Sequence, residues 1–170
     1  MSALDATNYD VPVTAAGYAH LRHELETLRE VRRPQLAEHF RQAREDSDPD
    51  NPVLFDLLEE QAQLEARINA LEAQVAAARV VAPTADGSAG IGSSVRVRHC
   101  DSGEIAEYEL VGPIESDAGN GRVSVEAPVG RALLGGRRGE TVLLDTPRGS
   151  EQLEILSVGL VGGRAAKRAA

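Results

Sequence analysis

A stripe of mostly apolar residues, spaced alternately three and four positions apart, runs through the chain between residues 54 and 78. Side chains at this spacing fall on one face of an α-helix and form the seam of a coiled coil. The seam positions are Leu54, Leu57, Gln61, Leu64, Ile68, Leu71, Val75 and Ala78. Pro52 precedes them and suits the first position of a helix. The sequence therefore predicts a long helix that begins near Pro52 and needs a partner along one face.

A partner helix is predicted upstream of this stripe. Thr14 is a good N-cap residue, and a second stripe with similar spacing follows it. Its members are Tyr18, Leu21, Leu25 and Leu28, continued with an offset by Leu36, Phe40 and Ala43. Pro34 interrupts the stripe, and a proline inside a helix usually kinks it, so we expect a bend near residues 30–34. The two stripes predict an antiparallel coiled-coil hairpin, about 40 Å long at 1.5 Å per residue. The alternative, packing into a larger core, is disfavoured because the other faces of both helices are charged.

The composition changes after the second stripe. Residues 81–92 are small and Gly-rich, which is typical of a flexible linker. Short β-prone runs separated by Gly and Pro then predict strands at 94–99, 106–111, 122–125, 140–144 and 152–158. Turns at 101–103 and 117–121 are predicted to close hairpins, and a short helix is expected from 128 to about 134. The fold class is α+β. Its predicted parts are a hairpin domain (1–80), a linker (81–92), a β-rich domain (93–160) and a flexible tail (161–170).

The charge of the chain excludes several function classes. Its 170 residues include 18 basic and 27 acidic side chains, a net charge of −9. Such an acidic chain is a poor candidate for autonomous binding to duplex DNA, which depends on phosphate neutralisation. No apolar run approaches the roughly 20 residues that span a bilayer, and the N-terminus lacks the features of a signal peptide. One cysteine, Cys100, can form neither an internal disulfide nor a structural zinc site alone. We expect a cytoplasmic protein that does not bind membranes.

Signals for an enzyme are weak. His20 and His23 stand three residues apart on the predicted helix, beside Glu24, but the order differs from the metalloprotease motif. Solvated positions on a helix face are the commoner explanation. Residues 135–139 are glycine-rich but lack the Lys and Ser/Thr of a phosphate-binding loop. We predict no intrinsic active site.

The connection between the predicted helices, residues 46–51, carries three carboxylates. Asp46, Asp48 and Asp50 alternate with Ser and Pro and are followed by Asn51. Two interpretations stay open. Asp and Asn favour turns and helix caps, so the segment is explained as a soluble turn. Carboxylate oxygens are also the ligands that hard divalent cations prefer, so the segment is also a candidate for action at a metal site, although the turn is the commoner explanation.

Three strings of this sequence together resemble the bacterial Gre transcript-cleavage factors. They are VTAAGYAHLRHELETLREVRRPQLAEHFRQARED (13–46), GSSVRVRHCDSGEIAEYELVG (92–112) and VEAPVGRALLGGRRGETV (125–142). The resemblance extends over essentially the whole of residues 11–160. It implies a coiled-coil N-terminal domain, an FKBP-like C-terminal domain and RNA polymerase as partner. It further implies that the hairpin enters the polymerase secondary channel while the C-terminal domain grips the channel rim.

The resemblance also implies roles for particular residues. Tip acids help to hold a second Mg²⁺ and a water at the polymerase active site, which then hydrolyses backtracked RNA; the factor has no cofactor of its own and is not itself the enzyme. A basic patch, matched by Arg32, Arg33 and Arg44, meets the RNA 3′ end, although these residues are equally explained by i, i+4 pairing with the glutamates of the hairpin. The rim-binding segment is matched by Glu126, Ala127 and Pro128, where Ala127 replaces a serine.

The tip departs from the pattern of the cleavage-active factors. Asp48 takes the place of the first acid, but Asn51 stands where a second acid is expected, and an amide supplies no anionic oxygen. Pro49 and Pro52 fix φ on both sides of Asp50. Some Gre homologues without cleavage activity inhibit transcription through a cluster of tip acids, and Asp46, Asp48 and Asp50 are similar to such a cluster. Our primary prediction is a monomeric polymerase-binding inhibitor of RNA synthesis; the alternative is a cleavage-stimulating elongation factor.

A third function class, peptidyl-prolyl isomerase, follows only from the FKBP-like fold that the resemblance implies. The composition disfavours it, because residues 91–170 contain one aromatic side chain, Tyr108, and such a pocket needs several.

Overall fold

The computed structural model of the chain describes residues 10–45, 52–147 and 149–161. The chain divides into two compact units. The helical unit comprises Tyr18–Ala78, and the sheet unit combines the described residues up to Gly17 with those from Arg79 onward. In the described part of the chain, none of the helices is both long and apolar enough to cross a membrane.

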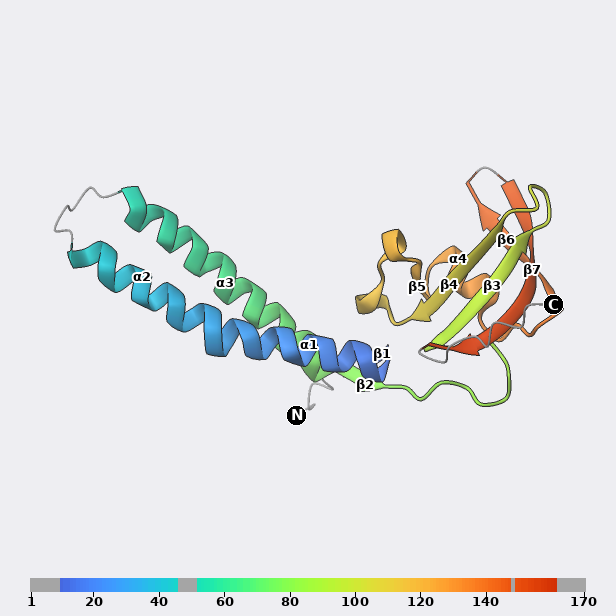
Figure 1. Cartoon of the computed structure of the whole chain (residues 1–170), viewed down its shortest axis with the longest axis horizontal. Coiled ribbons are helices and arrows are strands. Elements are labelled where there is room, and N and C mark those ends of the chain that lie inside the picture. The colour runs from blue at the N-terminus through green and yellow to red at the C-terminus, as the bar shows by residue number, and fades with distance from the viewer. Residues whose placement is uncertain (1–9, 46–51, 148, 162–170) are drawn as a thin grey trace, which may run out of the picture. The chain divides into compact units, whose positions relative to one another are not determined.

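The predicted helical hairpin is confirmed (Figure 1). One arm consists of α1 (Ala15–Thr27), a π-helical segment η1 (Leu28–Arg32) and α2 (Arg33–Glu45), and the other arm is α3 (Pro52–Ala77). The second helix begins at Pro52, as predicted. Seam residues Leu57, Ile68 and Leu71 are buried. A cluster of buried and partly buried side chains joins α2 to α3: Leu36, Phe40, Ala43, Leu54, Leu57 and Leu64.

The bend expected near residues 30–34 takes the form of a widened helical turn. The N–H of Arg33 donates to the carbonyl of Leu28, five residues earlier, which is the hydrogen bond of a π-helix. Pro34 follows directly. Its ring lacks an N–H and crowds the carbonyl four residues before it, so a wider turn just ahead of the proline relieves the conflict without ending the helix.

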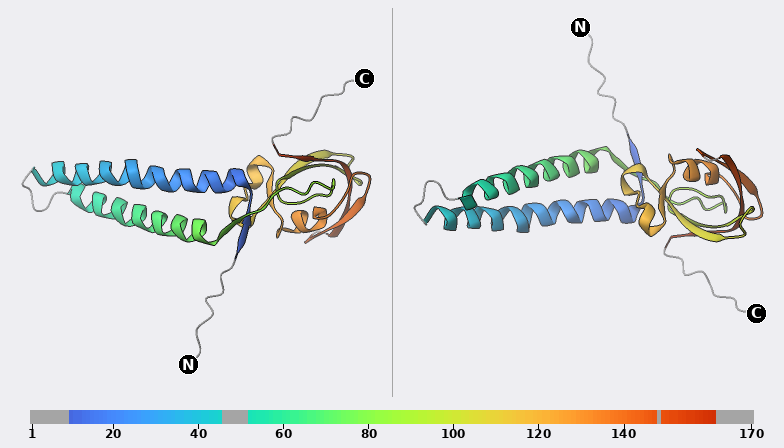
Figure 2. Two further views of the ribbon diagram at one scale, coloured as in Figure 1. Left: turned by 90° about the horizontal axis from the view of Figure 1, so that it is seen from below. Right: turned by 90° about the horizontal axis from the view of Figure 1, so that it is seen from above.

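The sheet unit contains a five-stranded sheet with the order β5-β4-β3-β7-β6. Its strands are β3 (Ser93–His99), β4 (Ile105–Val111), β5 (Arg122–Ser124), β6 (Thr141–Thr146) and β7 (Gly149–Leu160). All pairings are antiparallel except that of β4 with β5, which is parallel. Figure 2 shows the strands curving around the short helix α4 (Pro128–Leu133). The core lies between the sheet and this helix; it includes Val95, Val97, Leu110, Leu133, Leu153 and Ile155. All five predicted strands and the short helix are present.

The turn predicted at 117–121 was wrongly expected to close a hairpin. Asp117 and Arg122 do form an isolated antiparallel bridge, so the chain turns there. However, β5 then pairs in parallel with β4, with Arg122 opposite Glu109. The reason is that two short 3-10 helices, η2 (Pro113–Glu115) and η3 (Ala118–Asn120), first carry the chain back alongside β4. The other predicted turn is confirmed, since Gly103, at φ 73°, donates its N–H to the carbonyl of His99.

The start of the chain's described part belongs to the sheet unit. Strand β1 (Val11–Val13) pairs with β2 (Ala78–Val80), and the N–H of Val81 donates to the carbonyl of Val13 at 2.9 Å. The sequence placed residues 1–80 in one hairpin domain, whereas the division by contacts assigns residues 10–17 to the sheet unit. Neither short strand was predicted, because three residues are too few to show an alternating pattern.

The segment predicted to be a flexible linker is instead packed against the sheet unit. Ala89 is 2% exposed and belongs to its core. The N–H of Ala89 donates to the carbonyl of Gly136, and the N–H of Gly135 donates back to the carbonyl of Ala89. The small side chains that resemble a linker composition are what lets this segment approach the Gly135–Gly136 backbone closely. The predicted tail is described only at Val161; residues 162–170 lie outside the described part of the chain.

Candidate functional site

The predicted acidic tip falls between the end of α2 at Glu45 and the start of α3 at Pro52. Asp46, Asp48, Asp50 and Asn51 lie outside the described residues, so their role stays a prediction. The first two turns of α3, which follow the tip in sequence, present large apolar side chains to solvent: Phe55 is 69% exposed, and Val53 and Leu58 are about half exposed.

Two of the three predicted basic-patch residues pair across the hairpin. Arg32 donates to Glu60 at 2.9 Å, and Arg33 donates two hydrogen bonds to Glu65 at 2.8 and 2.6 Å. The hydrogen bonding of the Arg33 guanidinium to the Glu65 carboxylate is the main reason why the pKa of Arg33 is raised. The sequence suggested pairing within one helix at spacing i, i+4, but these acids lie 28 and 32 residues away.

These pairs belong to a row that links the two arms of the hairpin. Arg67 donates to Glu24 at 2.6 Å, and Arg29 pairs with Glu72. All four pairs are at least partly exposed, so each contributes little to stability. Arg44 lies in the last turn of α2 and is exposed. Among the described residues it forms no ion pair, which leaves Arg44 the most available cation of the predicted patch.

The predicted rim-binding segment forms the tight turn that starts α4. The backbone N–H of Glu126 donates to the hydroxyl of Ser124 at 3.1 Å, and that of Ala127 donates to the carbonyl of Ser124 at 3.0 Å. Pro128 occupies the first turn of α4, after Ala127 at the N-cap. Glu126 and Pro128 are both exposed. Ala127 supplies no side-chain cap, but Ser124 holds the turn from the other side, so the geometry of the segment survives the loss of a serine.

A glycine makes this turn possible. A Cβ on Gly130 would lie 1.9 Å from the carbonyl oxygen of Ser124, far inside van der Waals contact. The first turn of α4 can therefore sit against the backbone of Ser124 only with glycine at position 130. This close packing fixes the exposed Glu126 and Pro128 relative to the sheet.

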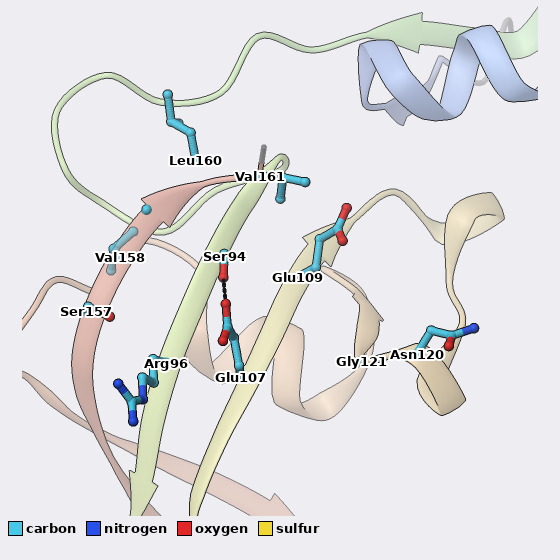
Figure 3. Close-up of a pocket in the computed structure, with 11 residues that line it drawn as sticks. Ser94, Arg96, Glu107, Glu109, Asn120, Gly121, Ser157, Val158, Leu160 and Val161 are labelled. Atoms are coloured by element: carbon cyan, nitrogen blue, oxygen red, sulfur yellow. Dashed lines mark hydrogen bonds between the residues drawn. The ribbon is translucent and has the colours of Figure 1, made fainter. Parts of the chain in front are cut away.

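A groove that the sequence did not predict lies on the sheet face opposite α4 (Figure 3). Its volume is about 620 Å³, and β3, β4 and β7 supply most of its lining, with Asn120, Gly121 and Val161 completing it. Within it the hydroxyl of Ser94 donates to Glu107 at 2.6 Å. Arg96 is exposed there and forms no ion pair with another described residue. Among the described residues, no cluster of three or more metal-ligating side chains occurs in this groove or elsewhere.

One side-chain hydrogen bond was missed because its partners are distant in sequence. The sequence shows no obvious partner for His99, but its Nδ1 lies 2.5 Å from the Oε1 of Glu151, which the pairing of β3 with β7 brings alongside. His20 and His23, the other histidine candidates, are both exposed on α1, in agreement with their assignment to a solvated helix face.

Both halves of the chain match models of one family. A model described as "Transcription elongation factor, N-terminal" matches residues 11–80, and one described as "Transcription elongation factor, GreA/GreB, C-term" matches residues 84–159. These two modules define a transcription elongation factor with a helical hairpin and a sheet unit. This chain belongs to the GreA/GreB family.

Relatives named transcription elongation factor GreA match along nearly their full length. The protein of Nitratidesulfovibrio vulgaris (strain DSM 19637 / Miyazaki F) is 38% identical over 159 residues, covering 91% of this chain and 98% of the relative. That of Thermodesulfovibrio yellowstonii is 36% identical, covering 87% and 96%. Among solved structures, GreA factor homolog 1 (Gfh1) of Thermus thermophilus is 32% identical, covering 88% and 98%, with a TM-score of 0.41. The family assignment rests on the sequence matches.

Proposed function

We propose that this protein binds RNA polymerase as a Gre-type elongation factor and stimulates the polymerase to cleave backtracked transcripts. The observation that carries the proposal is the match of both modules, at 38% identity, to a relative named transcription elongation factor GreA. This match favours the cleavage-stimulating elongation factor, which was the alternative predicted from the sequence, over the inhibitor that was our primary prediction. The protein is not the hydrolase in this scheme, because the polymerase active site cleaves the RNA.

In the proposed mechanism the hairpin enters the secondary channel of the polymerase. The carboxylates of Asp48 and Asp50 then help to retain a second Mg²⁺ of the polymerase, an ion that would activate the attacking water. Carboxylate oxygens suit this ion, whereas the amide of Asn51 supplies no negative charge. Arg44, exposed and without an ion pair to another described residue, is the residue we assign to the RNA 3′ end.

The sheet unit supplies the contact with the channel rim. Glu126 and Pro128 are exposed at a turn whose backbone Ser124 and Gly130 fix. A rigid, exposed turn loses little conformational entropy on binding. Glu126→Ala with Pro128→Ala is expected to weaken polymerase binding at least about tenfold, measured by competition with a labelled wild-type protein. Glu104→Ala, at an exposed acid in the turn before β4, is the matched control and should bind like the wild type.

Inhibition is the second candidate function, and the sequence of the tip favours it. Asn51 stands where a second acid is expected, and three aspartates crowd residues 46–50. Three anions near the polymerase metal would bind it in an unproductive geometry or repel the triphosphate of an incoming nucleotide. The protein would then slow nucleotide addition without shortening the transcript.

One assay separates the two functions. Backtracked and active elongation complexes are incubated with the full-length protein, and RNA cleavage and nucleotide addition are measured. The proposal expects transcript shortening by the wild type, its loss in Asp48→Asn with Asp50→Asn, and a gain in Asn51→Glu. Glu59→Gln, at an exposed acid of α3, is the control for charge. Slower addition without cleavage would establish the second candidate, and the absence of any effect or binding would reject both.

A further inference from the structure

The sheet unit contains a buried carboxylate that the proposed function does not use. The side chain of Glu115, at the end of η2, is 3% exposed. It accepts hydrogen bonds from the backbone N–H of Thr14 at 2.8 Å and from the Thr14 hydroxyl at 2.5 Å. The N–H of Gly112 and the guanidinium of Arg122 add contacts at 3.2 and 3.3 Å. A buried charge is costly unless it is paired and hydrogen-bonded, and this one is.

Thr14 serves two purposes in this arrangement. Its hydroxyl donates to Glu115 and at the same time accepts from the N–H of Gly17 at 2.9 Å, which caps the N-terminus of α1. The N-cap residue predicted from the sequence, Thr14, therefore also contacts Glu115, a residue 101 positions away.

Two glycines allow the chain segments to approach so closely. A Cβ on Gly17 would lie 1.8 Å from Oε1 of Glu115, and a Cβ on Gly112 would lie 1.8 Å from the carbonyl oxygen of Pro12. Any larger residue at position 17 would displace the carboxylate. We call the set Thr14, Gly17, Gly112, Glu115 and Arg122 the Glu115 anchor.

The anchor lies at the start of the helix that leads toward the tip. Helix α1 begins at Ala15 within the sheet unit and continues past Gly17 into the helical unit. The core cluster between the sheet and α4 contains none of the anchor residues. Loss of the anchor should therefore release the start of α1 while leaving the core of the sheet unit in place.

We propose that Glu115 is a positioning residue: by holding Thr14 it fixes the start of α1, and the effect of the hairpin tip on the transcript depends on this anchor. At 3% exposure the Glu115 side chain cannot itself form a contact surface for polymerase or RNA. The proposal rests on the proposed function, since it assumes that the tip acts in the polymerase while the sheet unit binds the rim. It adds a buried residue of the sheet unit on which the action of the tip depends.

The test compares two disruptive variants with a conservative one in the full-length protein. Glu115→Gln replaces one accepting oxygen by a donor, and Thr14→Val removes the hydroxyl, whereas Thr14→Ser retains it. Hydrogen exchange of the Thr14 and Gly17 amides reports the anchor directly. In Glu115→Gln and Thr14→Val we expect exchange to quicken on the order of tenfold, the size expected for one hydrogen bond to a charged group. In Thr14→Ser it should stay near the wild-type rate.

The functional test measures two quantities separately: the affinity for polymerase, and the cleavage or inhibition observed at saturating protein. At saturating protein, transcript cleavage or inhibition by Glu115→Gln and Thr14→Val should fall about tenfold, while polymerase affinity changes less than about twofold; Thr14→Ser should act like the wild type. Thermal unfolding identifies a variant that does not fold, in which case the other disruptive variant carries the test. Faster exchange with full effect at saturation would overturn the positioning role, as would a parallel loss of affinity. A wild-type protein without any effect on polymerase would instead overturn the proposed function, and the exchange rates would still report the anchor.

Discussion

The core of the sheet unit and the apolar cluster between α2 and α3 bury their side chains to different depths. In the sheet unit, Val95, Val97, Leu153 and Ile155 are 0% exposed beneath a curved sheet closed by α4. In the hairpin, the cluster between α2 and α3 retains 5–8% exposure at Leu36, Ala43 and Leu57. Two helices can cover one another along one face only, so this cluster stays nearer to solvent, whereas Ile68 and Leu71 farther along α3 are 1% and 0% exposed. The curved sheet and α4, in contrast, enclose the core side chains from both sides.

This difference indicates where each unit tolerates change. The sheet unit depends on close packing of apolar side chains and of backbone against glycine. The hairpin combines a narrow seam with ion pairs that are at least partly exposed, such as Arg32 with Glu60 and Arg67 with Glu24. Its surface can therefore vary in sequence at small cost, whereas the packing around α4, which presents the predicted rim-binding segment, cannot.

The largest expected effect comes from the core of the sheet unit. Leu153→Ala should lower the free energy of unfolding by about 2–5 kcal/mol, because it removes a fully buried side chain and leaves a cavity. Leu57→Ala in the hairpin should fall at the lower end of that range, near 2 kcal/mol. Leu143→Ala, at a 56% exposed position of β6, is the control and should stay within about 0.5 kcal/mol. Urea unfolding followed by circular dichroism measures all three. Equal losses for Leu57 and Leu153 would contradict the contrast between these two clusters.

A smaller but still marked effect is expected at the turn before α4. Gly130→Ala places a Cβ against the Ser124 carbonyl, so the turn must shift, at a cost of about 1–3 kcal/mol. Polymerase binding should weaken because Glu126 and Pro128 move with the turn. Gly159→Ala is the matched control, since a Cβ there meets nothing within 4 Å. The prediction is checked by thermal unfolding and competition binding. Wild-type stability in Gly130→Ala would show that the close approach is not required.

The smallest effect is expected from the hairpin ion pairs. A double-mutant cycle of Arg32→Ala and Glu60→Ala should give a coupling energy of about 0.2–1 kcal/mol, which salt reduces, because both side chains are more than 40% exposed. The same cycle with Arg44→Ala in place of Arg32→Ala should give no coupling. A coupling above about 2 kcal/mol would mean that the hairpin, like the sheet unit, depends on specific close contacts.

Local patterns in the sequence determined the elements of this fold. The seam from Leu54 to Ala78 predicted α3, Pro52 predicted its start, Pro34 predicted the disturbed turn, and Thr14 predicted the first cap. Short β-prone runs separated by Gly and Pro located all five strands of the sheet. These features depend on residues only a few positions apart. The regular geometry of a helix or strand places such residues on one face, so their spacing indicates the element directly. The similarity of three strings to the Gre factors supplied the family. Of the predicted sites, the basic patch and residues 126–128 lie in the described part of the chain, and the acidic tip lies outside it.

Only the tertiary structure decided which distant groups meet. The parallel pairing of β5 with β4, the packing of Ala89 into the core, the pair of His99 with Glu151 and the cross-hairpin partners of Arg32 and Arg33 all join residues far apart in sequence. Glu115 shows this most clearly: in the sequence it is one acid among 27, and nothing near it indicates burial. Its environment comes from Thr14, 101 residues away, and a contact at that separation exists only once the backbone has brought both segments together.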